Sequence, residues 1–113
     1  MTRDPEKFVY AMLDACRFLL DMTAGQTVDR FKSGRAFRSA IERELQIIDE
    51  AMIQLRAIAC QTVAQISEHE RIIGFRHVLV HGYHSLDADI VSFVIQDKLP
   101  ALRVELERCL GET

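Results

Sequence analysis

Apolar side chains recur every three or four residues along most of the chain, which is the spacing of one face of an α-helix. Asp4 and Pro5 predict the first helix start, because aspartate caps a helix N-terminus and proline fits the first turn. The helix is expected to end near residues 23–25, where Gly25 can terminate it. Its apolar positions form two adjacent rows, with Phe8, Met12, Ala15, Leu19 and Met22 in one and Val9, Leu13, Cys16 and Leu20 in the other.

A longer stretch with helical spacing covers residues 35–66 and predicts a single long helix. It follows a short turn that begins at Thr27 and is broken by Ser33 and Gly34. Its apolar steps of three and four are typical of the seam of a helical bundle. The seam consists of Phe37, Ile41, Leu45, Ile48, Met52, Leu55 and Ala59.

The last part of the chain predicts further helices. Ser67 and the glutamate three residues later have the spacing of a capping box, and Gly82 is well placed to end that helix. Asp87 or Asp89 would then start another helix, which Pro100 must kink or restart because proline has no backbone N–H. No strand pattern or internal repeat is visible.

These elements predict one all-α domain over residues 1–113, folded as an up-and-down antiparallel bundle of four to five helices. Apolar residues make up 49% of the chain, enough for a core, although a domain this small gains from a second copy. No run of apolar residues is long enough to span a bilayer, and the polar N-terminus does not resemble a signal peptide. Three scattered cysteines without a C-x-x-C pair fit a reducing compartment, so we expect a cytoplasmic protein.

The net charge of −3 argues against indiscriminate coating of nucleic acid, but one segment is locally basic. Residues 30–43 hold five cations and a single anion, Glu42. Arg35, Arg38 and Arg43 are therefore candidates for RNA backbone contact. The alternative is an ordinary solvated helix start.

Chemistry is concentrated in residues 71–84, which hold two arginines, three histidines and a tyrosine. On a helical wheel Arg76 lies between two apolar rows, which predicts packing on two sides and a second subunit as one of the neighbours. Histidine moves protons near neutral pH, and arginine binds phosphate oxygens as a fork. Arg76 and His81 therefore suit RNA cleavage by its own 2′-hydroxyl, although an arginine and a histidine five apart also occur by chance. His77 and His81, at i and i+4, could alternatively chelate zinc, but no Glu-x-x-His accompanies them.

The pattern R-x-x-x-x-H-x-Y formed by Arg76, His81 and Tyr83 resembles the signature of HepT-like proteins in the HEPN superfamily. Residues 72–76 and 79–83 around it are similar to that signature as well. The likeness extends to residues 38–48, which resemble the family's long second helix, and to residues 87–91 and 97–102, which resemble its last helix.

The resemblance implies a metal-independent ribonuclease toxin that needs no cofactor and works as a homodimer on RNA. Arg76 and His81 would be catalytic. It also implies a partner, a nucleotidyltransferase antitoxin that transfers AMP to Tyr83. Two features depart from the family pattern: His77 replaces the usual asparagine and would take a supporting role, and the chain has no tryptophan.

Two further expectations complete the prediction. The main alternative function is a non-catalytic docking or substrate-binding module for a nucleotidyltransferase, because HEPN-like domains can dock without cleaving. Tyr10 is expected to be packed rather than catalytic.

Overall fold

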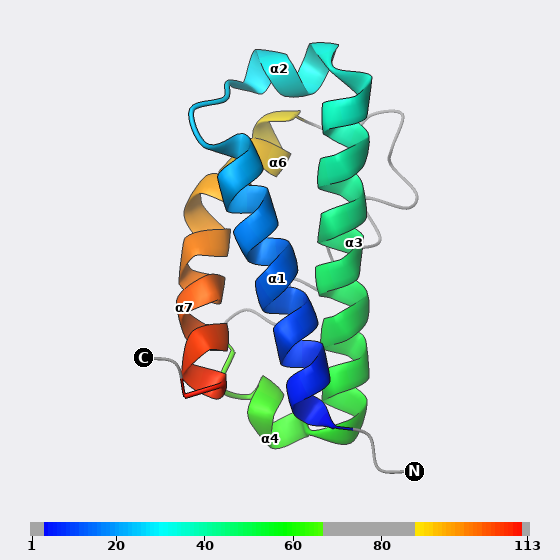
Figure 1. Ribbon diagram of the computed structural model, residues 1–113, viewed down its shortest axis with the longest axis vertical. Coiled ribbons are helices and arrows are strands. Elements are labelled where there is room, and N and C mark those ends of the chain that lie inside the picture. The colour runs from blue at the N-terminus through cyan, green and yellow to red at the C-terminus, as the bar shows by residue number, and fades with distance from the viewer. Residues whose placement is uncertain (1–3, 67–87, 112–113) are drawn as a thin grey trace.

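The computed structural model describes residues 4–66 and 88–111, and every regular element within them is a helix (Figure 1). This confirms the all-α fold. The elements are α1 (Pro5–Thr23), α2 (Val28–Ser33), α3 (Arg35–Ile58), α4 (Cys60–Val63), α6 (Ala88–Phe93), the π-helix η2 (Val94–Lys98) and α7 (Leu99–Cys109).

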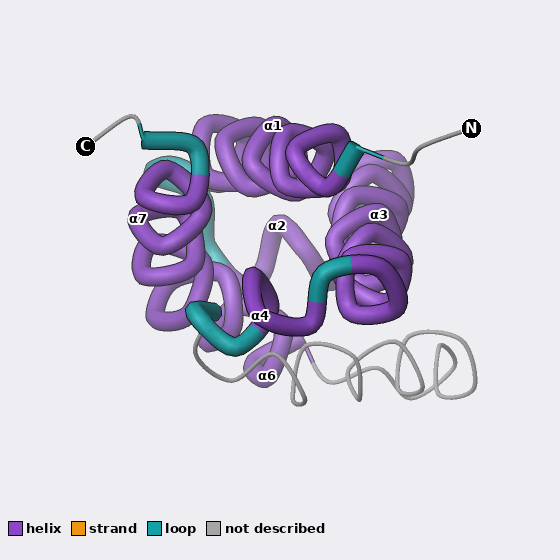
Figure 2. Tube along the Cα trace, turned by 90° about the horizontal axis from the view of Figure 1, so that it is seen from below, coloured by secondary structure: helices purple, strands orange, loops and turns teal. Residues whose placement is uncertain are grey.

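The three long helices lie side by side along the bundle. α1 runs antiparallel to both α3 and α7, which run in the same direction (Figure 1). α1 packs against both α3 and α7, and α4 crosses one end of the bundle (Figure 2). The guanidinium of Arg17 and the carboxylate of Glu107, 3.1 Å apart, join α1 to α7 at the surface.

The start and end of α1 follow the local sequence signals. The Asp4 side chain accepts a hydrogen bond of 2.9 Å from the Glu6 N–H, and Pro5 occupies the first turn. Gly25 follows the helix with φ at +74°, in the left-handed region that favours glycine. Thr27 stands at the start of α2 without a capping hydrogen bond from its side chain.

The core is formed by the apolar rows that the periodicity predicted. Met12, Leu13 and Leu19 of α1 are fully buried, as are Met52 and Leu55 of α3. α7 contributes Leu99, Leu102 and Leu106 to the same cluster. Tyr10 does not belong to this core. Its side chain is 53% exposed, so the expectation that it packs was wrong.

The predicted helix over residues 35–66 is too long, because α3 ends at Ile58. The backbone of Ala59 leaves the helical region (φ −151°, ψ 64°), and α4 follows in a new direction. A straight helix of that predicted length would span about 48 Å, longer than the largest dimension of the molecule, 43 Å. The break instead brings Val63 and Ile66, 2% and 1% exposed, into the core.

Pro100 restarts the last helix, as predicted. The helical hydrogen bonds widen before it, and the Leu99 N–H bonds the Val94 carbonyl five residues back. Pro100 has no N–H to offer the Gln96 carbonyl, and its ring would clash with that group in a regular α-helix. The segment therefore forms η2 before α7 begins at Leu99.

Candidate nucleic-acid interface

The predicted catalytic residues Arg76 and His81, with His77 and Tyr83, lie outside the described residues. The described chain stops at Ile66, at the end of the bundle crossed by α4, and resumes at Ala88, at the opposite end (Figure 1). The predicted site residues that the structure does place are therefore Arg35, Arg38 and Arg43 of α3.

These three arginines lie in the first half of α3. Arg35 and Arg43 are exposed, whereas Arg38 is half-buried and takes part in an interaction of its own. The first turn of α3 contains no acidic residue. Because the helix dipole places partial positive charge at that end, cations there are unfavourable for stability. Arg35 is thus poorly explained as a stabilising residue and well suited to meet an anion.

A fourth cation, Arg30 of α2, joins this end of the bundle. Its guanidinium carbon lies 5.0 Å from the centroid of the Phe37 ring, the geometry of a cation–π contact. Gly34 keeps this corner uncrowded, since a Cβ there would lie 3.1 Å from the Arg30 carbonyl oxygen and 3.3 Å from the Phe37 Cβ. The corner between α2 and α3 therefore presents positive charge beside an aromatic ring.

The structure also buries a carboxylate that the sequence analysis did not single out. Asp49 of α3 is 1% exposed, next to Ile48 in the bundle seam, and among the described side chains it is the one charged group so deeply buried. A buried carboxylate is costly unless an interaction compensates it, and Asp49 makes one. The sequence alone could not predict this burial, because an acidic residue at the edge of the apolar seam could equally be half-exposed.

The cysteines differ in environment. Burial raises the pKa of Cys16 to about 12, although the nearby Arg103 charge opposes the rise. Burial, reinforced by the Glu105 charge, also raises the pKa of the Cys109 thiol. A thiol held neutral is a poor nucleophile. Cys16 is therefore a core residue. In the part of the chain that the structure describes, no three metal-ligating side chains come together.

Comparison with known proteins identifies the family. A family model described as "Ribonuclease HepT-like" matches residues 12–109, a range that includes Arg76, His81 and Tyr83. The chain therefore belongs to the HepT-like ribonuclease family, which confirms the resemblance seen in the motif.

Its relatives span nearly the same length. The chain is 24% identical to "Putative RNase MJ1380" of Methanocaldococcus jannaschii, with 93% of the chain and 95% of the relative covered. It is 25% identical to "Putative RNase TTE0752" of Caldanaerobacter subterraneus subsp. tengcongensis, with 96% of each covered. No solved structure matches the chain significantly. No helix within residues 4–66 and 88–111 could cross a bilayer.

Proposed function

We propose that this chain is a metal-independent RNA endonuclease toxin that acts as a homodimer and is neutralised by a nucleotidyltransferase antitoxin. The observation that carries the proposal is the R-x-x-x-x-H-x-Y motif of Arg76, His81 and Tyr83 inside a chain that belongs to a ribonuclease family.

The motif supplies the two groups that RNA cleavage requires. His81 accepts the proton of the ribose 2′-hydroxyl, and the 2′-oxygen attacks the neighbouring phosphorus. The bond from phosphorus to the 5′-oxygen breaks, leaving a 2′,3′-cyclic phosphate and a 5′-hydroxyl that takes up a proton. Arg76 stabilises the negative charge that develops on the phosphate oxygens. His77 supports the site, and no step uses a metal ion.

The homodimer follows from the pattern around Arg76. In the helix that the sequence predicts here, Ile73 and Val80 would form a second apolar row beside that of Phe75 and Leu79, so the helix would be apolar on two sides. A chain of 113 residues buries a modest share of its surface, so a second copy is the proposed partner that buries the additional apolar row. It also brings two copies of Arg76 and His81 to one RNA.

The antitoxin acts on Tyr83. The tyrosine oxygen attacks the α-phosphate of ATP, a new oxygen–phosphorus bond forms, pyrophosphate leaves, and a base takes the tyrosine proton. The attached AMP adds bulk and negative charge two residues from His81, and this charge repels the RNA phosphates.

Arg35, Arg38 and Arg43 are proposed to contact the RNA backbone. Tyr83 precedes Ala88, the first residue of α6, by five positions. Covalent geometry alone keeps their Cα atoms within about 18 Å. α6 in turn contacts α2, which leads directly into Arg35. One bound RNA strand is therefore long enough to meet both groups of residues.

The test is cleavage of single-stranded RNA by the purified chain in the presence of EDTA. We expect cleavage, and a loss of about 10²- to 10⁴-fold in rate for Arg76→Ala or His81→Ala. His69→Ala serves as the matched control, since it removes a histidine outside the motif and should keep full activity. The products should carry a 2′,3′-cyclic phosphate end.

Three results would contradict the proposal. Cleavage that needs added zinc would favour the alternative in which His77 and His81 chelate a metal. A chain that binds the nucleotidyltransferase but leaves RNA intact would favour the docking module. A monomer in sedimentation equilibrium, at concentrations where cleavage is complete, would refute the shared site.

A further inference from the structure

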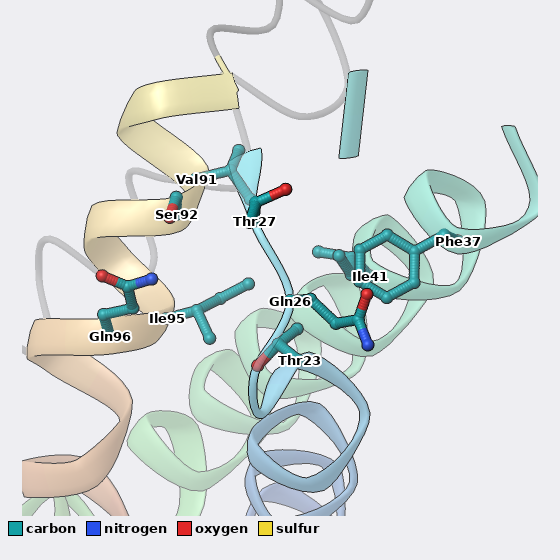
Figure 3. Close-up of a pocket in the computed structure, with 9 residues that line it drawn as sticks. All are labelled: Thr23, Gln26, Thr27, Phe37, Ile41, Val91, Ser92, Ile95 and Gln96. Atoms are coloured by element: carbon teal, nitrogen blue, oxygen red, sulfur yellow. The ribbon is translucent and has the colours of Figure 1, made fainter. Parts of the chain in front are cut away.

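A groove on the surface is shared by α1 and α3, which lie side by side (Figure 1). Its volume is about 410 Å³, within the range of about 300–1,000 Å³ that is usual for ligand sites. The small cavity at the other end of the bundle, where Gln26 and Gln96 meet, has about 30 Å³ and holds little more than a water molecule (Figure 3). Of these two hollows, the groove alone has room for side chains of a partner. It is lined by Phe8, Ile47, Glu50, Ala51, Ile53 and Gln54.

The groove is mainly apolar and open to solvent. Ala51, a small residue that is 7% exposed, belongs to the buried core beneath it. Phe8, Ile47 and Ile53 are half-buried, so each still presents apolar surface to the outside. A surface of this kind gains free energy when a partner removes it from water.

The apolar surface continues along α1 beyond the groove. Phe8, Ala11, Ala15 and Phe18 recur at steps of three and four, so they form one stripe of the helix. The stripe ends at Phe18, whose side chain is 47% exposed. From Phe8 to Phe18 it extends about 15 Å along the axis, the length of roughly three helical turns. This length suits a docked helix, which lays its apolar face into a groove of this type.

The charges beside the groove are predominantly negative. Among the described residues that line it, Glu50 is the one charged side chain. The neighbouring positions of the two helices carry four acids, Asp14, Asp21, Glu44 and Glu50, against two bases, Lys7 and Arg43. The Lys7 ammonium lies 5.9 Å from the centre of the Phe8 ring, near the outer limit of a cation–π contact. A partner with a positive charge is therefore favoured here.

This charge excludes two of the possible occupants. RNA phosphates would be repelled by the net negative charge of the groove. A second copy that met this face symmetrically would bring the same surface to both sides of the interface, so acids would face acids. The complementary occupant is a helix of another protein, apolar on one side and flanked by lysine or arginine.

We propose that the groove binds an amphipathic helix of a partner protein, whose apolar row packs beside Phe8 and Ile47 and whose basic side chains pair with Glu50 and Asp14. The inference goes beyond the proposed function, because such a partner can dock whether or not the chain cleaves RNA. Glu50 lies about 22 Å along α3 from Arg35. A helix docked in the groove would therefore leave the start of α3 open to RNA.

The test measures binding of the full chain to two fluorescent helical peptides of about eighteen residues, or five turns, each with one row of leucines. One peptide carries lysine beside the row, and the other carries glutamate. We expect the lysine peptide to bind more tightly by about fivefold or more. Glu50→Lys with Asp14→Lys should reverse this preference. Asp29→Lys with Asp97→Lys, at exposed acids of α2 and η2, is the matched control and should preserve it. Ile47→Gln should weaken both peptides by about tenfold.

The four exchanged acids are exposed, so these variants should keep the fold, as circular dichroism can verify. If neither peptide binds, or if Glu50→Lys with Asp14→Lys leaves the preference unchanged, the docking site is refuted. If Ile47→Gln turns a dimer into a monomer in sedimentation equilibrium, the groove is an interface between copies of this chain and the proposal fails. Weaker RNA binding by Ile47→Gln, with the fold intact, would make the groove an RNA surface and overturn the proposal as well.

Discussion

Removing the two exposed arginines in the first half of α3 should lower the salt dependence of RNA binding by a calculable amount. Arg35 and Arg43 are both exposed, and their eight-residue separation places them about 12 Å apart along the helix axis. That is close enough for one RNA strand to contact both. The proposed perturbation is the double variant Arg35→Gln with Arg43→Gln, which removes two charges.

The magnitude follows from the release of counterions. Each phosphate contact on a single strand contributes about 0.7 to the slope of log affinity against log salt. Two lost contacts lower the slope by about 1.4, so between 50 and 200 mM salt the wild type loses about sevenfold more affinity than the variant. The assay is fluorescence anisotropy with labelled RNA in the His81→Ala background.

A control variant that loses the same number of charges elsewhere separates the loss of RNA contacts from the effect of a changed net charge. Arg56→Gln with Arg108→Gln removes two exposed arginines from the last turns of α3 and α7. Arg56 lies about 32 Å along the helix from Arg35, beyond the Debye length of about 10 Å at 0.1 M salt. The control should keep the wild-type slope. An equal fall in the slope for both variants would refute an RNA contact surface on the first half of α3.

The remaining predictions concern stability, measured by thermal or urea unfolding. Leu13→Ala leaves a cavity in the core and should lower the free energy of unfolding by about 2–5 kcal/mol, or roughly 8–20 °C in Tm. Tyr10→Ala, at an exposed position, should change it by less than about 0.5 kcal/mol. Equal losses for the two variants would contradict the assigned core. Burial raises the pKa of Cys16 from 9.0 to about 12, so its thiol ionises at a lower pH in the unfolded chain than in the folded one. Stability should therefore fall as the pH rises from 9 to about 12. Cys16→Ala should lack that component, and an unchanged pH profile would contradict it. Gly25→Ala should destabilise the protein by about 0.5–1 kcal/mol, because the cost of a positive φ for alanine exceeds the gain from restricting the unfolded chain. Gly25→Asn should cost less, because asparagine tolerates positive φ better. A stabilised alanine variant would be inconsistent with the left-handed backbone.

The sequence by itself determined the features that depend on neighbours along the chain. Asp4 and Pro5 started α1, and Pro100 interrupted the last helix, because capping and the missing proline N–H act within one turn. The seam from Ile41 to Leu55 was visible because helical periodicity records which face will be buried. The R-x-x-x-x-H-x-Y motif identified the family for the same reason, since its residues are close in sequence.

The tertiary structure decided the features that depend on residues distant in the chain. The break at Ala59 arises where Val63 and Ile66 can be buried only by turning across the end of the bundle. The burial of Asp49 and the exposure of Tyr10 depend in the same way on which helix lies opposite. The cavity unites Gln26 with Gln96, seventy residues later, and no local pattern links them. Periodicity specifies which face of a helix is apolar, but only packing specifies what that face meets.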